Sequence, residues 1–171
     1  MDKEFKDPRL PALYALWSAH REGLGLPLAS AFDPETLPRF KPILNLIEVR
    51  HDPLRFRHRF VGSEILRATG QDFTGRVFPS PDSGTAAAQI HDSLVRLVEE
   101  ARPYRRFARQ DWQPGRLPAE TIELPLADAD QRIVAILRGV TYGVVAPPLP
   151  DRMVFEPLAA LVGEPGLEPR S

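Results

Sequence analysis

The chain has 171 residues, 43% of them hydrophobic and 26% charged, and its formal net charge is -1. This length suits one domain with its own core, and the balanced charge provides no global attraction to nucleic acid or to a membrane surface. The absence of cysteine excludes disulfides, thiolate metal sites, a cysteine nucleophile and a flavin–cysteine adduct.

The N-terminal sequence, MDKEFKDPRL, is charged and lacks the apolar centre of a signal peptide. No run approaches the roughly 18 apolar residues of a membrane span. We therefore expect a cytoplasmic protein with neither a membrane nor nucleic acid as a partner.

Residues 8–22 have the periodicity of a helix, with Asp7 as a candidate cap and Pro8 in the first turn. One apolar stripe follows helical spacing: Leu10, Leu13, Tyr14 and Trp17. A capping residue, Asp33, followed by Pro34 and an acid in the first turn, predicts a second, short helix over 33–41.

The period then changes to that of strands. Residues 43–50 and 54–61 flank an Asp-Pro turn and predict a β-hairpin. In the second strand, alternation places one set on a buried face: Leu54, Phe56, His58 and Phe60. The other set faces water: Arg55, Arg57 and Arg59.

Helices are predicted over 63–69, closed by Gly70, and over 85–101. Three strands follow, at 104–111, 120–126 and 132–144. The tail is rich in proline, and its segment 153–163 predicts one short amphipathic helix.

This order predicts an α+β fold with a five-stranded antiparallel sheet, helices on one face and an additional N-terminal helix. We expect the last strand to lie beside the first. The domain division is an N-terminal helix and connector (1–30), the sheet domain (31–146) and a proline-rich tail (147–171).

Several segments together resemble the single-domain PAS proteins of bacteria. They are the run AFDPETLPRFKPILNLIEV, the run DPLRFRHRFVGSEILRATGQDFTGR, ARPYRRF after the long helix and IELPLADAD before the last strand. The resemblance covers roughly residues 8–145. It implies a PAS fold, a signalling role and frequent homodimerisation through a leading helix, but no single ligand.

Two features depart from the PAS pattern. His58 occupies a position where an aromatic residue is more usual. The turn LADADQRI has no glycine, so we expect a loop of about four or five residues in place of a tight turn.

A ligand cavity is predicted between the sheet and the long helix. Its expected lining is Phe56, His58, Phe60, Ile65, Leu94 and Ile136. His58 is either a buried structural histidine or a ligand contact. His91 falls at the edge of its helix's apolar face, as a boundary residue. We expect no haem, and the histidine spacing predicts no metal site.

Exposed arginines are predicted on two strands: Arg55, Arg57 and Arg59 on one, and Arg105, Arg106 and Arg109 on the other. They form either a solvated sheet face with acidic cross-strand partners or a docking face for an acidic partner or phosphate.

The first helix has more apolar residues than one packing stripe requires. We expect a homodimer interface that includes Leu13, Leu16 and Trp17. Alternatively, the tail segment 153–163 covers the same flank within one chain.

The sequence contains no catalytic motif, so we expect no enzyme. Two functions stay open. One is a sensor of a small ligand, and the other is a ligandless adaptor that acts through dimerisation. In either case the signal would pass to a partner such as a histidine kinase or a cyclase.

Overall fold

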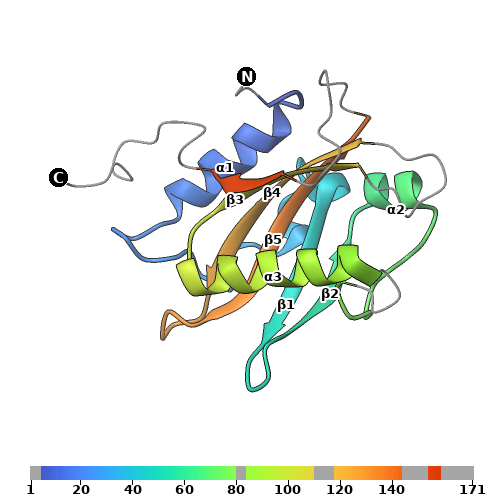
Figure 1. The fold of residues 1–171 in the computed structure, drawn as a ribbon. Coiled ribbons are helices and arrows are strands. Elements are labelled where there is room, and N and C mark those ends of the chain that lie inside the picture. The colour runs from blue at the N-terminus through green and yellow to red at the C-terminus, as the bar shows by residue number, and fades with distance from the viewer. Residues whose placement is uncertain (1–4, 80–83, 110–117, 144–153, 159–171) are drawn as a thin grey trace.

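The computed structural model describes residues 5–79, 84–109, 118–143 and 154–158. These residues form an α+β structure in which helices pack against an antiparallel sheet of six strands (Figure 1).

The N-terminal part consists of one helix and three short turns. Helix α1 spans Arg9–Ala19 and is shorter at both ends than predicted. The 3-10 turns are η1 (Ala29–Ala31), η2 (Pro34–Thr36) and η3 (Lys41–Ile43). Asp33 accepts a hydrogen bond from the Glu35 amide at 3.0 Å and so begins η2. The predicted cap is confirmed, but the helix predicted over 33–41 is only a 3-10 turn.

The predicted hairpin is present. Strand β1 (Leu44–Arg50) pairs with β2 (Arg55–Val61), and helix α2 (Ser63–Thr69) follows. Gly70 ends α2 in the left-handed conformation, with φ of 69°, which glycine adopts without steric cost.

The outer edge of β2 is partly covered by the chain that follows α2. The amide of His58 donates to the Arg76 carbonyl at 2.8 Å, and the amide of Phe78 donates to the Phe56 carbonyl at 3.0 Å. This segment therefore satisfies backbone groups that an open edge strand would leave unpaired.

The rest of the sheet follows the long helix α3 (Gly84–Glu100). Its strands are β3 (Tyr104–Arg109), β4 (Pro118–Ala127), β5 (Ile133–Tyr142) and β6 (Val154–Pro157). The strand order is β2-β1-β5-β4-β3-β6, so β5 lies beside β1 as expected.

The sixth strand corrects the predicted number of five. Residues 154–157 pair with β3 and extend the sheet at its edge. The helix predicted over 153–163 is therefore wrong for these residues. Pro157 is compatible with this position because an edge strand tolerates a residue that has no amide donor.

Helices α1 and α3 lie on opposite faces of the sheet. A Cβ built on Gly139 of β5 would lie 2.9 Å from Leu13 and 3.1 Å from Leu10, so this face of the strand meets α1. On the other face, Arg106 of β3 donates to Ser93 of α3 at 2.7 Å. Figure 1 shows α3 crossing in front of the strands.

The turn between β4 and β5 occupies the five residues 128–132, which matches the expected loop length. Gln131 adopts the positive φ, 64°, that a glycine would usually supply. Its side chain compensates by accepting a hydrogen bond from the Leu26 amide at 2.7 Å.

Candidate functional site

The layer between the sheet and α3 contains polar side chains, each of which contacts the next across the sheet. We call them the buried polar chain. Its members are His58, Asn45, Arg138, Glu123, Arg106 and Ser93. They come from all five strands from β2 to β3 and from α3, so only the folded sheet brings them together.

His58 lies at one end of the buried polar chain and is only 7% exposed. The Asn45 amide nitrogen lies 2.9 Å from His58 Nδ1 and also donates to the Phe60 carbonyl. Since Nδ1 accepts from this amide, the imidazole proton belongs on Nε2. The rings of Phe73 and Phe78 lie 5.6 and 4.6 Å from the imidazole ring.

This environment keeps His58 neutral. Burial, and secondarily the positive charge of Arg138, lowers the pKa of His58 to about 3. A neutral imidazole is an acceptor at one nitrogen and a donor at the other, but it is no proton donor for acid catalysis near pH 7.

Arg138 occupies the centre of the buried polar chain. Its Nη1 donates to Asn45 Oδ1 at 2.9 Å, and its guanidinium carbon lies 4.8 Å from the centre of the Phe78 ring. Its Nε lies 3.4 Å from Glu123 Oε2. Burial lowers the pKa of Arg138, against the effect of the Glu123 carboxylate.

One carboxylate serves two guanidiniums here. Glu123 is fully buried and accepts from Arg106 Nε at 2.5 Å, while its second oxygen faces Arg138. Within the part of the chain that the structure describes, Arg138 Nε has no hydrogen-bond acceptor.

The far end of the buried polar chain is attached to α3. Arg106 Nη2 donates to the Ser93 hydroxyl at 2.7 Å, and that hydroxyl donates to the Ile90 carbonyl. The Arg106 guanidinium also lies over the Phe155 ring, with 4.6 Å to its centre. The arrangement thus holds cationic donors within an otherwise apolar layer and is suited to binding a polar or anionic group.

Four of the six predicted lining residues belong to this layer. Phe56, Leu94 and Ile136 are buried in the main core, as is His58 beside it. The His91 ring lies 5.8 Å from the Phe56 ring although His91 is exposed, in line with its expected place at the helix boundary.

Ile65 lies in a separate small core cluster, with Val61, Ala119 and Val140. The existence of a ligand cavity remains a prediction.

The prediction for Phe60 is wrong. His58 pairs with Ile47 whereas Phe60 pairs with Leu46, so a β-bulge inserts one residue between them. Because Ile47 and Leu46 point to opposite faces, so do His58 and Phe60. Phe60 therefore faces away from α3.

The predicted exposure of Arg105 and Arg106 is also wrong, because they are 8% and 4% exposed. They point to opposite faces and bind different acids of β4: Arg105 pairs with Glu120, and Arg106 pairs with Glu123. Acidic cross-strand partners were expected, but not their burial. The side chain of Arg109 lies outside the described residues.

Sequence reasoning missed most of the buried polar chain, including Asn45, Glu123 and Arg138. A usable signal was present in β5, where Arg138 shares the parity of Ile136, a predicted lining residue. Residues of equal parity point to the same face of a strand, so this spacing alone puts Arg138 on the inward face.

Most of the α1 residues predicted to form the dimer interface are packed in the core of the same chain. Leu13 and Trp17 are fully buried, and the Trp17 indole donates to the Pro125 carbonyl at 2.9 Å. Leu16 is half-buried. The homodimer remains a prediction, but neither Leu13 nor Trp17 has surface to contribute to it.

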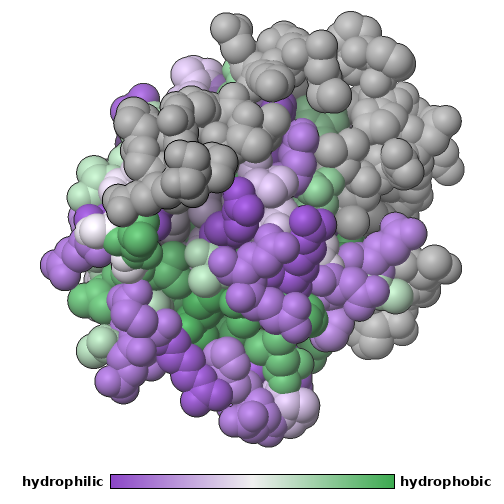
Figure 2. Space-filling view, turned by 60° about the vertical axis from the view of Figure 1, so that its left-hand side comes forward, coloured by the Kyte–Doolittle hydropathy of each residue, from purple (hydrophilic) through white to green (hydrophobic). Residues whose placement is uncertain are grey.

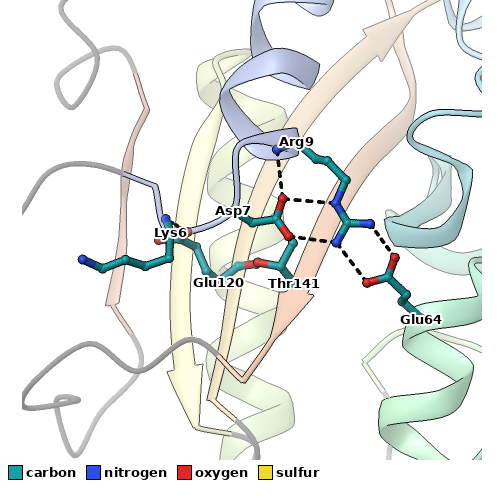
Figure 3. A network of polar contacts seen from close by, with 6 residues as sticks. All are labelled: Lys6, Asp7, Arg9, Glu64, Glu120 and Thr141. Carbon is teal, nitrogen blue, oxygen red and sulfur yellow. Dashed lines mark hydrogen bonds and ion pairs between the residues drawn. The ribbon is translucent and has the colours of Figure 1, made fainter.

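A second polar network fixes the start of α1 (Figure 3). Arg9 binds Asp7 and also Glu64 of α2, and it lowers the pKa of both carboxyls. Nearby, the Lys6 amide donates to Glu120 at 3.1 Å, and the Thr141 hydroxyl donates to the Glu120 carbonyl. These contacts attach the N-terminal segment to the sheet and to α2.

Comparison with models of protein families finds no match, and comparison with curated proteins finds none either. Within the described ranges, no group of three or more histidine, aspartate or glutamate side chains has an arrangement that could hold a metal ion. In the same part of the chain, no helix has both the length and the apolar character needed to cross a membrane.

Proposed function

We propose that the chain is a PAS-type signalling module that recognises a small polar ligand between the sheet and α3. The observation that carries the proposal is the buried polar chain, with Arg138 at its centre. The antiparallel sheet, with β5 beside β1 and a long helix across one face, also supports it.

The buried charges of this layer are energetically costly. Removing a guanidinium and a carboxylate from water is unfavourable, and well-packed apolar residues are often at least as stabilising in their place. A core that retains Glu123, Arg106 and Arg138 therefore suggests a role in specificity. Arg138 Nε makes only the long 3.4 Å contact with Glu123, so an anionic or hydrogen-bonding ligand would find an incompletely satisfied donor there.

The proposal gives the site a binding role and no reaction. A binding event in this layer would act on α3 through Ser93 and on β2 through His58. The signal would then pass to a partner protein, such as a histidine kinase or a cyclase, by surface contact.

The test is native mass spectrometry of the full chain, with its absorbance spectrum, beside Arg138→Met and Arg132→Met. Arg132 is the matched control, because its side chain is 55% exposed. We expect the wild type and the control to retain a small molecule that Arg138→Met loses. A bare chain in all three proteins, as purified and after incubation with a bacterial metabolite extract, would contradict the sensor.

A ligandless adaptor that acts through dimerisation is the second candidate. It is favoured by exposed apolar residues beyond α1, since Leu24 is 75% and Leu28 45% exposed. Figure 2 shows apolar surface gathered in the lower part of one face, with hydrophilic side chains around it. Light scattering of the wild type and of Leu24→Glu/Leu28→Glu tests it: a micromolar dimer that the variant loses is expected, and a monomeric wild type would contradict it.

A further inference from the structure

The β1–β2 hairpin carries an exposed group of arginines on the side of the sheet that faces away from α3. We call Arg50, Arg55, Arg57 and Arg59 the arginine face; all four are exposed. Adjacent residues of β2 alternate between the two sides of the sheet, so the burial of Phe56 and His58 toward α3 directs Arg55 and Arg57 away from it.

Within the described residues, no helix covers this surface. Helix α1 lies on the same side of the sheet but packs on β4 and β5, and β5 and β1 separate it from β2. Figure 1 shows the hairpin extending below the rest of the sheet, away from α1.

The charges of the arginine face are not balanced by its neighbours. Arg50 and Arg55 lie directly opposite each other in the antiparallel register, and Arg57 lies opposite Glu48. Like charges at directly opposed positions destabilise a sheet. The stability of the hairpin therefore does not account for this pair of arginines.

Glu48 is the acid at the centre of this cluster. Its carboxylate accepts from Arg50 Nε at 2.5 Å, and its pKa is lowered by Arg50 first, then by the charges of Arg57 and Arg59. Within the described part of the chain, Arg55, Arg57 and Arg59 form no ion pair. This one carboxylate is therefore shared by three guanidiniums, those of Arg50, Arg57 and Arg59.

We propose that the arginine face binds an acidic segment of a partner protein in extended conformation. Alternate side chains of a strand are about 6.6–6.8 Å apart. An extended partner with acidic residues at every second position repeats at the same distance, so two of its carboxylates match Arg55 and Arg57. Guanidinium groups bind carboxylates through paired hydrogen bonds, which adds geometric selection to the charge attraction.

A protein segment fits this surface better than nucleic acid does. The chain has a net charge of -1, so its long-range field does not attract a polyanion. The arginine face is also confined to two neighbouring strands. This inference goes beyond the ligand proposed above and does not depend on it.

The test measures fluorescence anisotropy of labelled peptides with the full chain at low ionic strength. One ten-residue peptide alternates glutamate and serine, and a second has the same composition with the glutamates in one block. The variant is Arg55→Glu/Arg57→Glu. The matched control is Arg67→Glu/Arg76→Glu, which makes the same charge change at two positions outside the arginine face.

We expect the alternating peptide to bind more tightly than the block peptide, with an affinity that falls as salt is added. The variant should lose at least about tenfold in affinity, and the control should lose less than about twofold. Equal losses in both variants would overturn the proposal, as would binding of a DNA duplex or of phosphatidylserine vesicles in preference to either peptide. Failure to bind any of these probes would overturn it as well.

Discussion

Replacement of Glu123 by glutamine tests the energetics of the buried polar chain directly. The carboxylate is fully buried and lies 2.5 Å from Arg106 Nε and 3.4 Å from Arg138 Nε. Glutamine retains the shape and one acceptor oxygen but removes the negative charge. Two buried guanidiniums would then face a neutral amide.

Breaking a buried ion pair from one side destabilises a protein by about 3–5 kcal/mol. For a chain of this length each kcal/mol lowers the melting temperature by roughly 2–4 °C, so we expect a fall of about 6–20 °C. The control is Glu35→Gln, which breaks the exposed pair with Lys41, whose side chain is 40% exposed. An exposed pair of this kind contributes about 0–1 kcal/mol.

Urea denaturation and thermal unfolding, followed by circular dichroism, provide both measurements. Introducing Arg138→Met beside Glu123→Gln should reduce the cost of the glutamine, with a coupling of about 0.5–3 kcal/mol. The reasoning is refuted if Glu123→Gln destabilises the protein no more than Glu35→Gln does.

Three further outcomes are expected. Trp17→Phe should destabilise the protein by about 1–3 kcal/mol in urea, because the buried Pro125 carbonyl loses its indole donor; an unchanged midpoint would contradict this role. Gly139→Ala should lose about 1–3 kcal/mol, because its Cβ meets leucine side-chain ends at 2.9 and 3.1 Å. Gly62→Ala should lose more, because its Cβ meets carbonyl oxygens at 2.4 and 2.5 Å; the reverse order in urea would count against the packing argument. The third outcome concerns His58, whose folded pKa of about 3 lies below the unfolded value of 6.5. Between these two pH values the unfolded state binds a proton that the folded state does not, so the protein becomes less stable as the pH is lowered. Between pH 7 and pH 5 the wild type should lose about 2 kcal/mol more than His58→Gln, and equal losses in urea titrations at the two pH values would show that His58 does not contribute.

Local signals in the sequence predicted the elements whose geometry is decided locally. Ser63 and Gly70 bound a helix that the structure places over the predicted residues, and the alternation of β2 correctly separated Phe56 from Arg57. The position of β5 beside β1 followed from the need to pair every strand. The boundaries of α2 and the alternation of β2 depend on residues that are close in the sequence. The pairing of β5 with β1 is the arrangement that gives every predicted strand a neighbour.

The misses share a different cause. Arg106 resembled a surface residue because the acid that permits its burial lies on another strand, 17 positions away. Phe60 points to the opposite face from His58 because of a β-bulge, and this bulge exists only in the pairing of β2 with β1. Likewise, the edge strand at 154–157 has no helical or alternating pattern long enough to identify it. Non-local pairing decided all three.

The net charge of -1 conceals how differently the arginines of this chain are used. Arg106 and Arg138 are buried against the shared carboxylate of Glu123, so two positive charges lie close to one negative charge. Arg55 and Arg57 are exposed and form no ion pair within the described residues. Among the described residues, the acids that bring the total to -1 therefore form no ion pair with Arg55 or Arg57. Because His58 and Arg57 are adjacent on β2, the buried polar chain and the arginine face are separated by only the thickness of one strand.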